Sequence, residues 1–244
     1  RDYGVDSFNS DRSWFDFAKQ NLAGDELYPG DPQALVATGY LRHGLYEYNQ
    51  ADVKTQWEEI LTDLTDTTGD VFLGMSMGCC RCHDHKFDPI PRDDYYRLRA
   101  FFAAVRWVDD APAATPEEIA SHRAALRNWE EATAEIRAKL AAIEQPHWDK
   151  AAANRLKFLP DEIKAVFAKA PEDRTPHDRQ LAELADRQLE DKRNDIDFNK
   201  TLKDEQLAEW KRLHEELAKF DSQKPKTLPQ ALAISEIGQQ APEV

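Results

Sequence analysis

Residues 115–146, "TPEEIASHRAALRNWEEATAEIRAKLAAIEQP", carry the strongest helical signal in the chain. Thr115, followed by Pro116 and then by Glu118, is typical of a helix start with a capping box. Thr133 is a polar interruption, and Pro146 predicts the end of the helix. The apolar positions follow a heptad-like spacing, which favours packing against a second helix: Ile119, Leu126, Trp129, Ile136, Leu140 and Ile143.

A second stretch of the same character supplies a partner for this helix. Residues 201–220, "TLKDEQLAEWKRLHEELAKF", repeat the charged surface and the apolar stripe. The two stretches predict a long antiparallel helical hairpin, coiled-coil-like, over residues 111–225, with a helical connector between its arms. The tail, residues 226–244, loses the helical period and is expected to return to the first region or lead to a further domain.

The first region, residues 1–110, is richer in aromatic residues and glycine. Its apolar spacing predicts short amphipathic helices, among them one over 53–68 that continues to Met77 or breaks near Gly69, and one over 91–108. We find no sustained alternation of apolar and polar residues, so the expected class is all-α: a compact helical part plus the hairpin. The best strand candidate is "ALAISEI", residues 231–237.

Composition excludes several classes of partner. The net charge of −14, with 32% charged residues, argues against nucleic acid and anionic membranes, which select basic surfaces. No run approaches the roughly 20 apolar residues of a membrane span. The chain opens without methionine, and we expect it to be a section of a longer polypeptide. Its oligomeric state is not predicted.

All the sulfur lies in "GMSMGCCRCHDHKFDP", residues 74–89. Cys79, Cys82 and His83 form C-x-x-C-H, the attachment pattern of a c-type haem. Two thiols at this spacing add to the two haem vinyl groups, and the adjacent imidazole supplies the proximal ligand of the iron. The motif therefore predicts covalent haem c, with Cys80 as a third, buried thiol that attachment does not need.

Two other kinds of site compete for the same residues. A compact metal site would use Cys79, Cys82, His83 and His85, although four ligands within seven residues crowd a tetrahedral geometry. A redox dithiol would use the two outer cysteines, but the βαβ context of a thioredoxin-like site is missing.

Neighbouring residues complete the predicted haem site. Arg81 and Lys86 are cationic and close to the attachment point, so we expect them to pair with the haem propionates. His43 is the candidate distal ligand. His85 is the candidate for a propionate contact, for a second metal site with Asp84 or Asp88, or for capping the local turn. Met75 and Met77 are expected to pack rather than to ligate the iron.

Four segments carry a resemblance to a known family: "LAGDEL", "ATGYLR", "TDTTGDVFLGMSMGCCRCHDHKFDPIPRDDYYRLRAFF" and "LPQALAISEIG". They resemble the planctomycete-type, cytochrome-c-like secreted proteins of uncertain function. Cys80 departs from the family's usual small residue, and His43 lies near a position that is usually Asn-like. The resemblance implies an extracytoplasmic (periplasmic or extracellular) haem protein, in genomic company that suggests polymer degradation, and it supplies no reaction.

Three functions follow as hypotheses. The first is a c-type cytochrome domain that transfers electrons between a linked domain or redox partner protein and an external acceptor. The second is an open-coordinate haem oxidoreductase that acts on a small oxidant or a carbohydrate-derived substrate. The third is a metal-stabilised interaction module. The first two differ in the sixth ligand of the iron.

Overall fold

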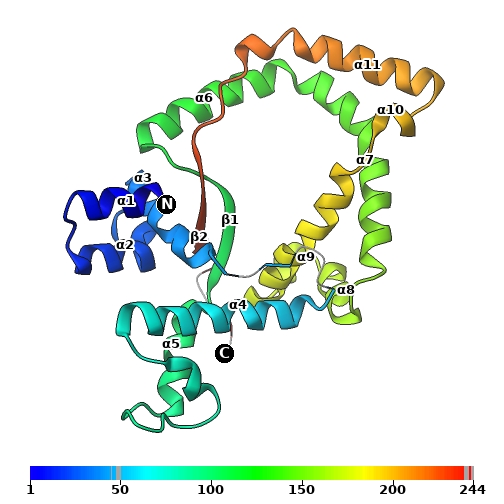
Figure 1. The fold of residues 1–244 in the computed structure, drawn as a ribbon. Helices are drawn as coiled ribbons and strands as arrows, with labels where there is room; N and C mark the ends of the chain where they lie inside the picture. Colours follow the sequence, from blue (N-terminus) through cyan, green and yellow to red (C-terminus); the bar gives the residue numbers. More distant parts are fainter. Residues whose placement is uncertain (45, 48–50, 239–241, 243–244) are drawn as a thin grey trace.

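The computed structural model describes residues 1–44, 46, 47, 51–238 and 242. Helices dominate it, and the sheet found among these residues has two strands, so the predicted helical class is confirmed (Figure 1). The N-terminal elements are α1 Asp2–Asn9, α2 Trp14–Leu27, α3 Pro32–Ala37, the 3-10 helix η1 Thr38–Arg42, α4 Val53–Thr68, the π-helical turn η2 Gly69–Leu73, the 3-10 helix η3 Met77–Arg81 and α5 Arg92–Phe102.

Helix α4 ends through a change of helical type. Its buried stripe includes Val53, Trp57, Ile60 and Leu64, as the sequence predicts. The backbone then widens into the π-turn η2, and Gly74 follows in the left-handed region with φ of 64°, a conformation that glycine adopts without steric cost. The regular α-helix thus ends at Thr68, near the predicted break at Gly69, while helical backbone continues as the π-turn to Leu73 and does not reach Met77.

The sheet corrects the expectation that β structure is missing from the first region. Strand β1 Val105–Pro112 pairs antiparallel with β2 Gln230–Glu236, and β2 confirms the strand predicted over 231–237. The helix predicted over 91–108 ends at Phe102. Val105 and Trp107 are both buried, as alternating strand positions, but Val105 also follows Phe102 at helical spacing, which extended the helical pattern too far. Strand β1 also crosses residue 110, the boundary that the sequence predicts between the first region and the helical hairpin.

The long helical stretch is bent at Thr133 rather than ended at Pro146. Helices α6 Pro116–Ala132 and α7 Ala134–Leu156 meet at Thr133, whose buried hydroxyl donates to the carbonyl of Trp129 at 2.7 Å. The capping box at Thr115 forms as predicted. The predicted end at Pro146 is wrong: packing along α7 outweighs the backbone hydrogen bond that the proline removes.

The remaining helices pack along α7. Helix α11 lies against its first half and runs in the opposite direction (Figure 1), with Leu140 and Leu213 in the shared core. Helix α9 packs against α7, α4 and α8. The C-terminal elements are α8 Asp161–Ala168, the 3-10 turn Pro171–Asp173, α9 Pro176–Asn194, α10 Phe198–Thr201, α11 Asp204–Ala218 and the 3-10 turn Asp221–Gln223.

A group that we call the joint links the sheet to η1 and α9. It consists of Arg42, Trp107, Asp109 and Arg187. The guanidinium of Arg42 lies 4.3 Å from the ring centroid of Trp107 and donates to the Val108 and Ala233 carbonyls. Asp109 contacts Arg42 at 2.6 Å and Arg187 at 2.5 Å. One carboxylate thus holds two cations that approach from η1 and α9.

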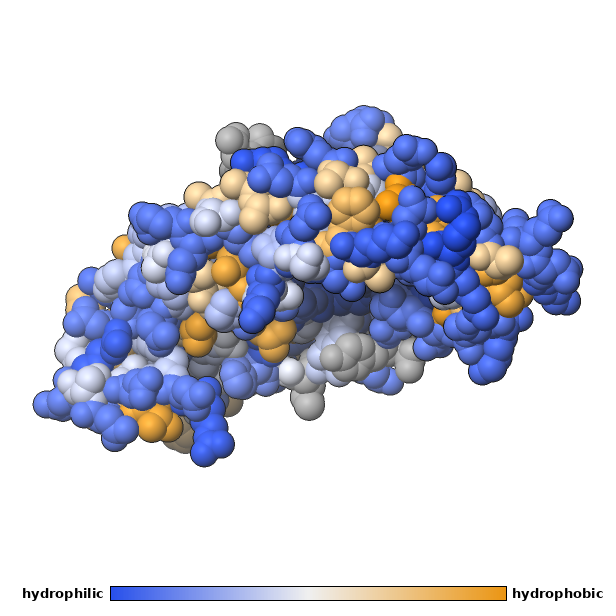
Figure 2. Space-filling view, turned by 90° about the horizontal axis from the view of Figure 1, so that it is seen from above, coloured by the Kyte–Doolittle hydropathy of each residue, from blue (hydrophilic) through white to orange (hydrophobic). Residues whose placement is uncertain are grey.

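The face seen in Figure 2 is mostly hydrophilic, with small hydrophobic patches between the charged side chains. This agrees with the high charged fraction of the sequence. None of the described helices is both long and apolar enough to cross a bilayer.

Candidate functional site

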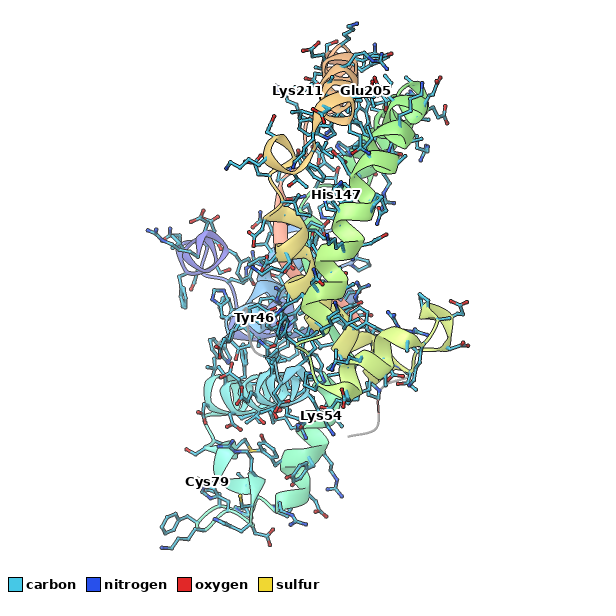
Figure 3. The ribbon with its side chains drawn as sticks, turned by 90° about the vertical axis from the view of Figure 1, so that its right-hand side faces the viewer. Tyr46, Lys54, Cys79, His147, Glu205 and Lys211 are labelled. Carbon is cyan, nitrogen blue, oxygen red and sulfur yellow. The ribbon has the colours of Figure 1, made fainter. Side chains whose placement is uncertain are left out.

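The motif lies at one end of the molecule, in a segment that we call the motif loop, residues 74–92. Figure 3 shows Cys79 at this end, with Glu205 and Lys211 of α11 at the opposite end. The short helix η3 carries both Cys79 and Cys80 and packs against α4 and α5. The motif therefore rests on two helices of the N-terminal region.

The three thiols have different environments. Cys79 and Cys82 are exposed, whereas Cys80 is fully buried, as predicted. Its thiol points to the carbonyl oxygen of Ile90 at 3.7 Å, and burial raises its pKa. Cys80 belongs to a small core with Met77, Ile90 and Tyr95. The spacer residue thus anchors the turn while its two neighbours remain accessible.

The two methionines also separate. Met77 is buried in that small core, which confirms its packing role. A Cβ on Gly69 would lie 2.4 Å from Met77 Cγ, so the glycine makes room for this side chain. Met75 is 43% exposed and is not a core residue, because the left-handed Gly74 turns the chain outward before it.

His83 presents one free ring nitrogen. The ring is exposed, and Nδ1 lies 2.7 Å from the backbone oxygen of Asp84. A carbonyl oxygen only accepts, so Nδ1 carries the proton and Nε2 of the neutral ring keeps its lone pair. This arrangement is common in histidines that bind a metal through Nε2.

His85 closes the loop instead of facing outward. Its Nδ1 accepts the backbone N–H of Asp88 at 2.9 Å, and its own backbone N–H donates to the Ile90 carbonyl at 2.9 Å. The second of these bonds spans the turn from residue 85 to residue 90. Asp84 accepts the N–H of Arg92 at 2.8 Å at the start of α5. Of the roles considered for His85, these contacts support capping of the local turn.

The predicted propionate partners lie on both sides of the motif. Arg81 is half-exposed: its Nε donates to the Gly78 carbonyl at 3.1 Å, and its Nη2 lies 3.6 Å from the carboxylate of Asp66 on α4. Lys86 is exposed, with its ammonium 5.2 Å from the ring centroid of Phe87. Both cations are solvent-accessible, so neither is committed to a buried ion pair.

Two ionisable groups lie beneath the motif. Burial raises the pKa of Asp66, and burial with the nearby Asp66 charge raises the pKa of Tyr95 to about 12. No well-formed hydrogen bond satisfies the Tyr95 hydroxyl among the described residues. A Cβ on Gly78 would lie 2.9 Å from an Asp66 oxygen, so η3 packs closely over this polar pair.

His43 lies elsewhere. It follows η1, which packs against α2 and β2, and it lines a cavity with Tyr40, Asp63 and Thr67. Among the described residues, no member of the motif loop lines that cavity. The structure therefore does not bring the candidate distal ligand together with the motif, and the role of His43 stays a prediction.

The donor set fits a covalently bound haem. Two exposed thiols flank a buried spacer, and the following imidazole has a free Nε2. Leu73, Met75 and Phe87, on segments that flank the motif, expose apolar surface. Within the part of the chain that the structure describes, no three His, Cys, Asp or Glu side chains are grouped closely enough to hold a metal ion.

Comparison with known proteins adds one match. Residues 1–107 match the family PSCyt2, described as a protein of unknown function (DUF1549). No curated protein and no solved structure matches the chain. The match includes the motif loop and agrees with the resemblance in the first region. It ends within β1 and does not extend to the long helices.

Sequence reasoning missed several supporting residues. Tyr96 donates its hydroxyl to the Arg81 carbonyl at 3.0 Å, and the Asp84 carbonyl orients His83. The signal for Tyr96 was its place one residue beyond the buried Tyr95, on the side of α5 nearest the solvent. The backbone carbonyl carries no sequence signal, because every residue has one.

Proposed function

We propose that the chain is a haem c domain that transfers electrons in an extracytoplasmic, multidomain protein. The observation that supports this most is the arrangement of Cys79, Cys82 and His83: two accessible thiols and an oriented imidazole at the end of one short helix. When bound, haem supplies an iron that passes single electrons. The family match over residues 1–107 is compatible with this proposal.

The chain's own residues have separate tasks in the proposal. Cys79 and Cys82 tether the group, and His83 ligates the iron through Nε2 while the Asp84 carbonyl fixes its ring. Arg81 and Lys86 are positioned to balance the propionate charges at the surface. An exposed site suits transfer to a protein partner, because the electron then has a short path to the surface.

The test is covalent attachment. The protein is expressed with haem c maturation machinery and examined by intact mass and a pyridine haemochrome spectrum. We expect one haem per chain, and Cys82→Ala should prevent stable attachment. Cys80→Ala is the matched control, because it removes a thiol of the same motif without removing a tether. An apoprotein mass in the unaltered chain would refute the proposal.

The open-coordinate oxidoreductase is the second candidate. The observation that favours it is that His43, the candidate distal ligand, lines a cavity to which no described residue of the motif loop contributes. Met77, which begins η3, is buried in the small core with Cys80. Carbon monoxide or cyanide binding to the reduced or oxidised holoprotein distinguishes the two. Rapid binding would favour the enzyme, and a low-spin spectrum without binding would favour electron transfer.

A further inference from the structure

A second cavity has no described residue of the motif loop in its lining. It has a volume of about 340 Å³ and is lined from α2, η1, α4, α5 and the sheet; α2, α5 and the lower end of the sheet surround this part of the molecule in Figure 1. Most of its wall is apolar, with Leu22, Leu98, Phe102 and Ile234 among the lining residues. Its volume lies within the range of small-molecule sites.

The charged groups at this cavity all have the same sign. Asp25, Glu26 and Glu236 line it, and its lining contains no Lys, Arg or His among the described residues. None of the three carboxylates has an ion-pair partner within that part of the chain. Burial raises the pKa of Asp25, and the charges of Glu26 and Glu236 add to the effect. Uncompensated negative charge beside an apolar wall favours a cationic guest.

Two unsatisfied polar atoms also belong to the lining. One carboxylate oxygen of Asp25 is buried without a hydrogen-bond partner among the described residues. Thr68 is 4% exposed, and its hydroxyl lies close enough to Tyr40 to lower the pKa of that phenol, but no well-formed hydrogen bond joins them. Buried polar atoms usually have a partner, so the Asp25 oxygen and the Thr68 hydroxyl both have hydrogen-bonding capacity left for a guest.

The backbone fixes the position of Asp25 and Glu26, which we call the acidic corner of the cavity. Helix α2 is bent at Ala23, whose φ of −153° and ψ of 39° are not helical. The next residue, Gly24, packs so closely on α3 that a Cβ would lie 2.2 Å from the Ala34 carbonyl oxygen. The bend and this contact set the direction of the last turn of α2, which carries Asp25 and Glu26, so the corner is built before any ligand arrives.

We propose that this cavity binds a small organic ammonium ion: a primary or secondary amine with a compact apolar body. The carboxylate of Asp25 accepts the N–H groups, Thr68 supplies a neutral polar contact, and the apolar wall covers the body. Phe101, which is 81% exposed and lines the cavity, covers the ligand at the mouth. A bare metal ion suits the site poorly, since the described carboxylates are not grouped as metal ligands.

The test uses three probes of one shape and different charge: cyclohexylmethylamine, cyclohexylmethanol and cyclohexanecarboxylate. Binding to the whole chain at neutral pH is measured by calorimetry. We expect the amine to bind at least about tenfold more tightly than the alcohol, since a hydrogen bond between charged groups is stronger than one to a neutral hydroxyl. The carboxylate should not bind. Equal affinity for amine and alcohol, or no amine binding, would overturn the proposal.

Three variants make the test specific. Asp25→Asn keeps the shape and should lower amine affinity at least about tenfold while leaving alcohol binding unchanged. Phe101→Ala should weaken both probes without changing the unfolding midpoint, because the ring is exposed. Glu131→Gln, on the exposed face of α6, removes the same charge far from the lining and should change nothing. If Asp25→Asn and Glu131→Gln reduce amine binding equally, the loss reflects the net charge of the protein, and the proposed site is wrong.

Discussion

The motif loop and the joint are built in opposite ways. In the motif loop, the contacts that orient the functional groups join residues that are close in sequence: His83 to Asp84, His85 to Ile90, and Tyr96 to Arg81. In the joint, Arg42 reaches Asp109 and Ala233, which are 67 and 191 residues away. The comparison teaches that the chemistry of this chain is organised locally, whereas its shape depends on a few distant contacts.

Replacement of Trp107 by alanine gives the largest expected effect. The ring is buried, packs on Tyr46 and lies under Arg42 and Arg187. We expect Trp107→Ala to lower the free energy of unfolding by about 3–5 kcal/mol, measured by denaturant unfolding. Phe87→Ala in the motif loop is the matched control, and its ring is 83% exposed. An equal loss of unfolding free energy in both variants would contradict the claim that the fold depends on the joint and not on the motif loop.

High pH tests the core beneath the motif. The pKa of Tyr95 is raised from 10.0 to about 12, so between these values the unfolded tyrosine loses its proton and the folded one keeps it. Stability should then fall as pH rises, by about 1.4 kcal/mol per pH unit. Tyr95→Phe should remove this part of the slope. An unchanged slope in the variant would show that the hydroxyl does not titrate differently in the folded chain.

Asp109 tests whether one carboxylate holds the joint. Its side chain is half-exposed, but the Arg42 side chain is only 6% exposed. Asp109→Asn should lower the free energy of unfolding by about 1–2 kcal/mol, because it leaves a buried guanidinium with a weaker acceptor, and solvent screening limits the loss. Asp110→Asn, on the next and exposed residue, serves as the control. A larger loss from Asp110→Asn would contradict the assignment of Asp109.

Thiol reactivity gives the smallest energetic effect and the sharpest local test. In the apoprotein we expect Ellman's reagent to modify two thiols quickly and the third only on unfolding, because Cys80 is buried and its pKa is raised. Cys80→Ala should remove the slow thiol and leave the fast phase intact. Three fast thiols would mean that the spacer does not anchor the motif loop.

The sequence predicted the helices with strong apolar periodicity, and it identified the C-x-x-C-H motif from residue spacing alone. It placed the capping box at Thr115 and the burial of Cys80, and it predicted an end of the α-helix near Gly69 as one of two courses. It missed β1 because Val105 fits both a helical and an alternating pattern, and a strand is decided by its partner, which lies more than a hundred residues later. It ended a helix at Pro146 because the packing of α7 cannot be seen in the local sequence.

The sequence by itself determined the local chemistry: the C-x-x-C-H spacing, the high negative charge and the amphipathic helices. These depend on residue type and short-range spacing, which the chain carries directly. Only the tertiary structure decided which residues enclose Cys80, where His43 lies, and how Asp25, Glu26 and Glu236 meet at one cavity. Such contacts join residues from separate segments of the chain, and their energy depends on burial and mutual distance, which short-range spacing does not encode.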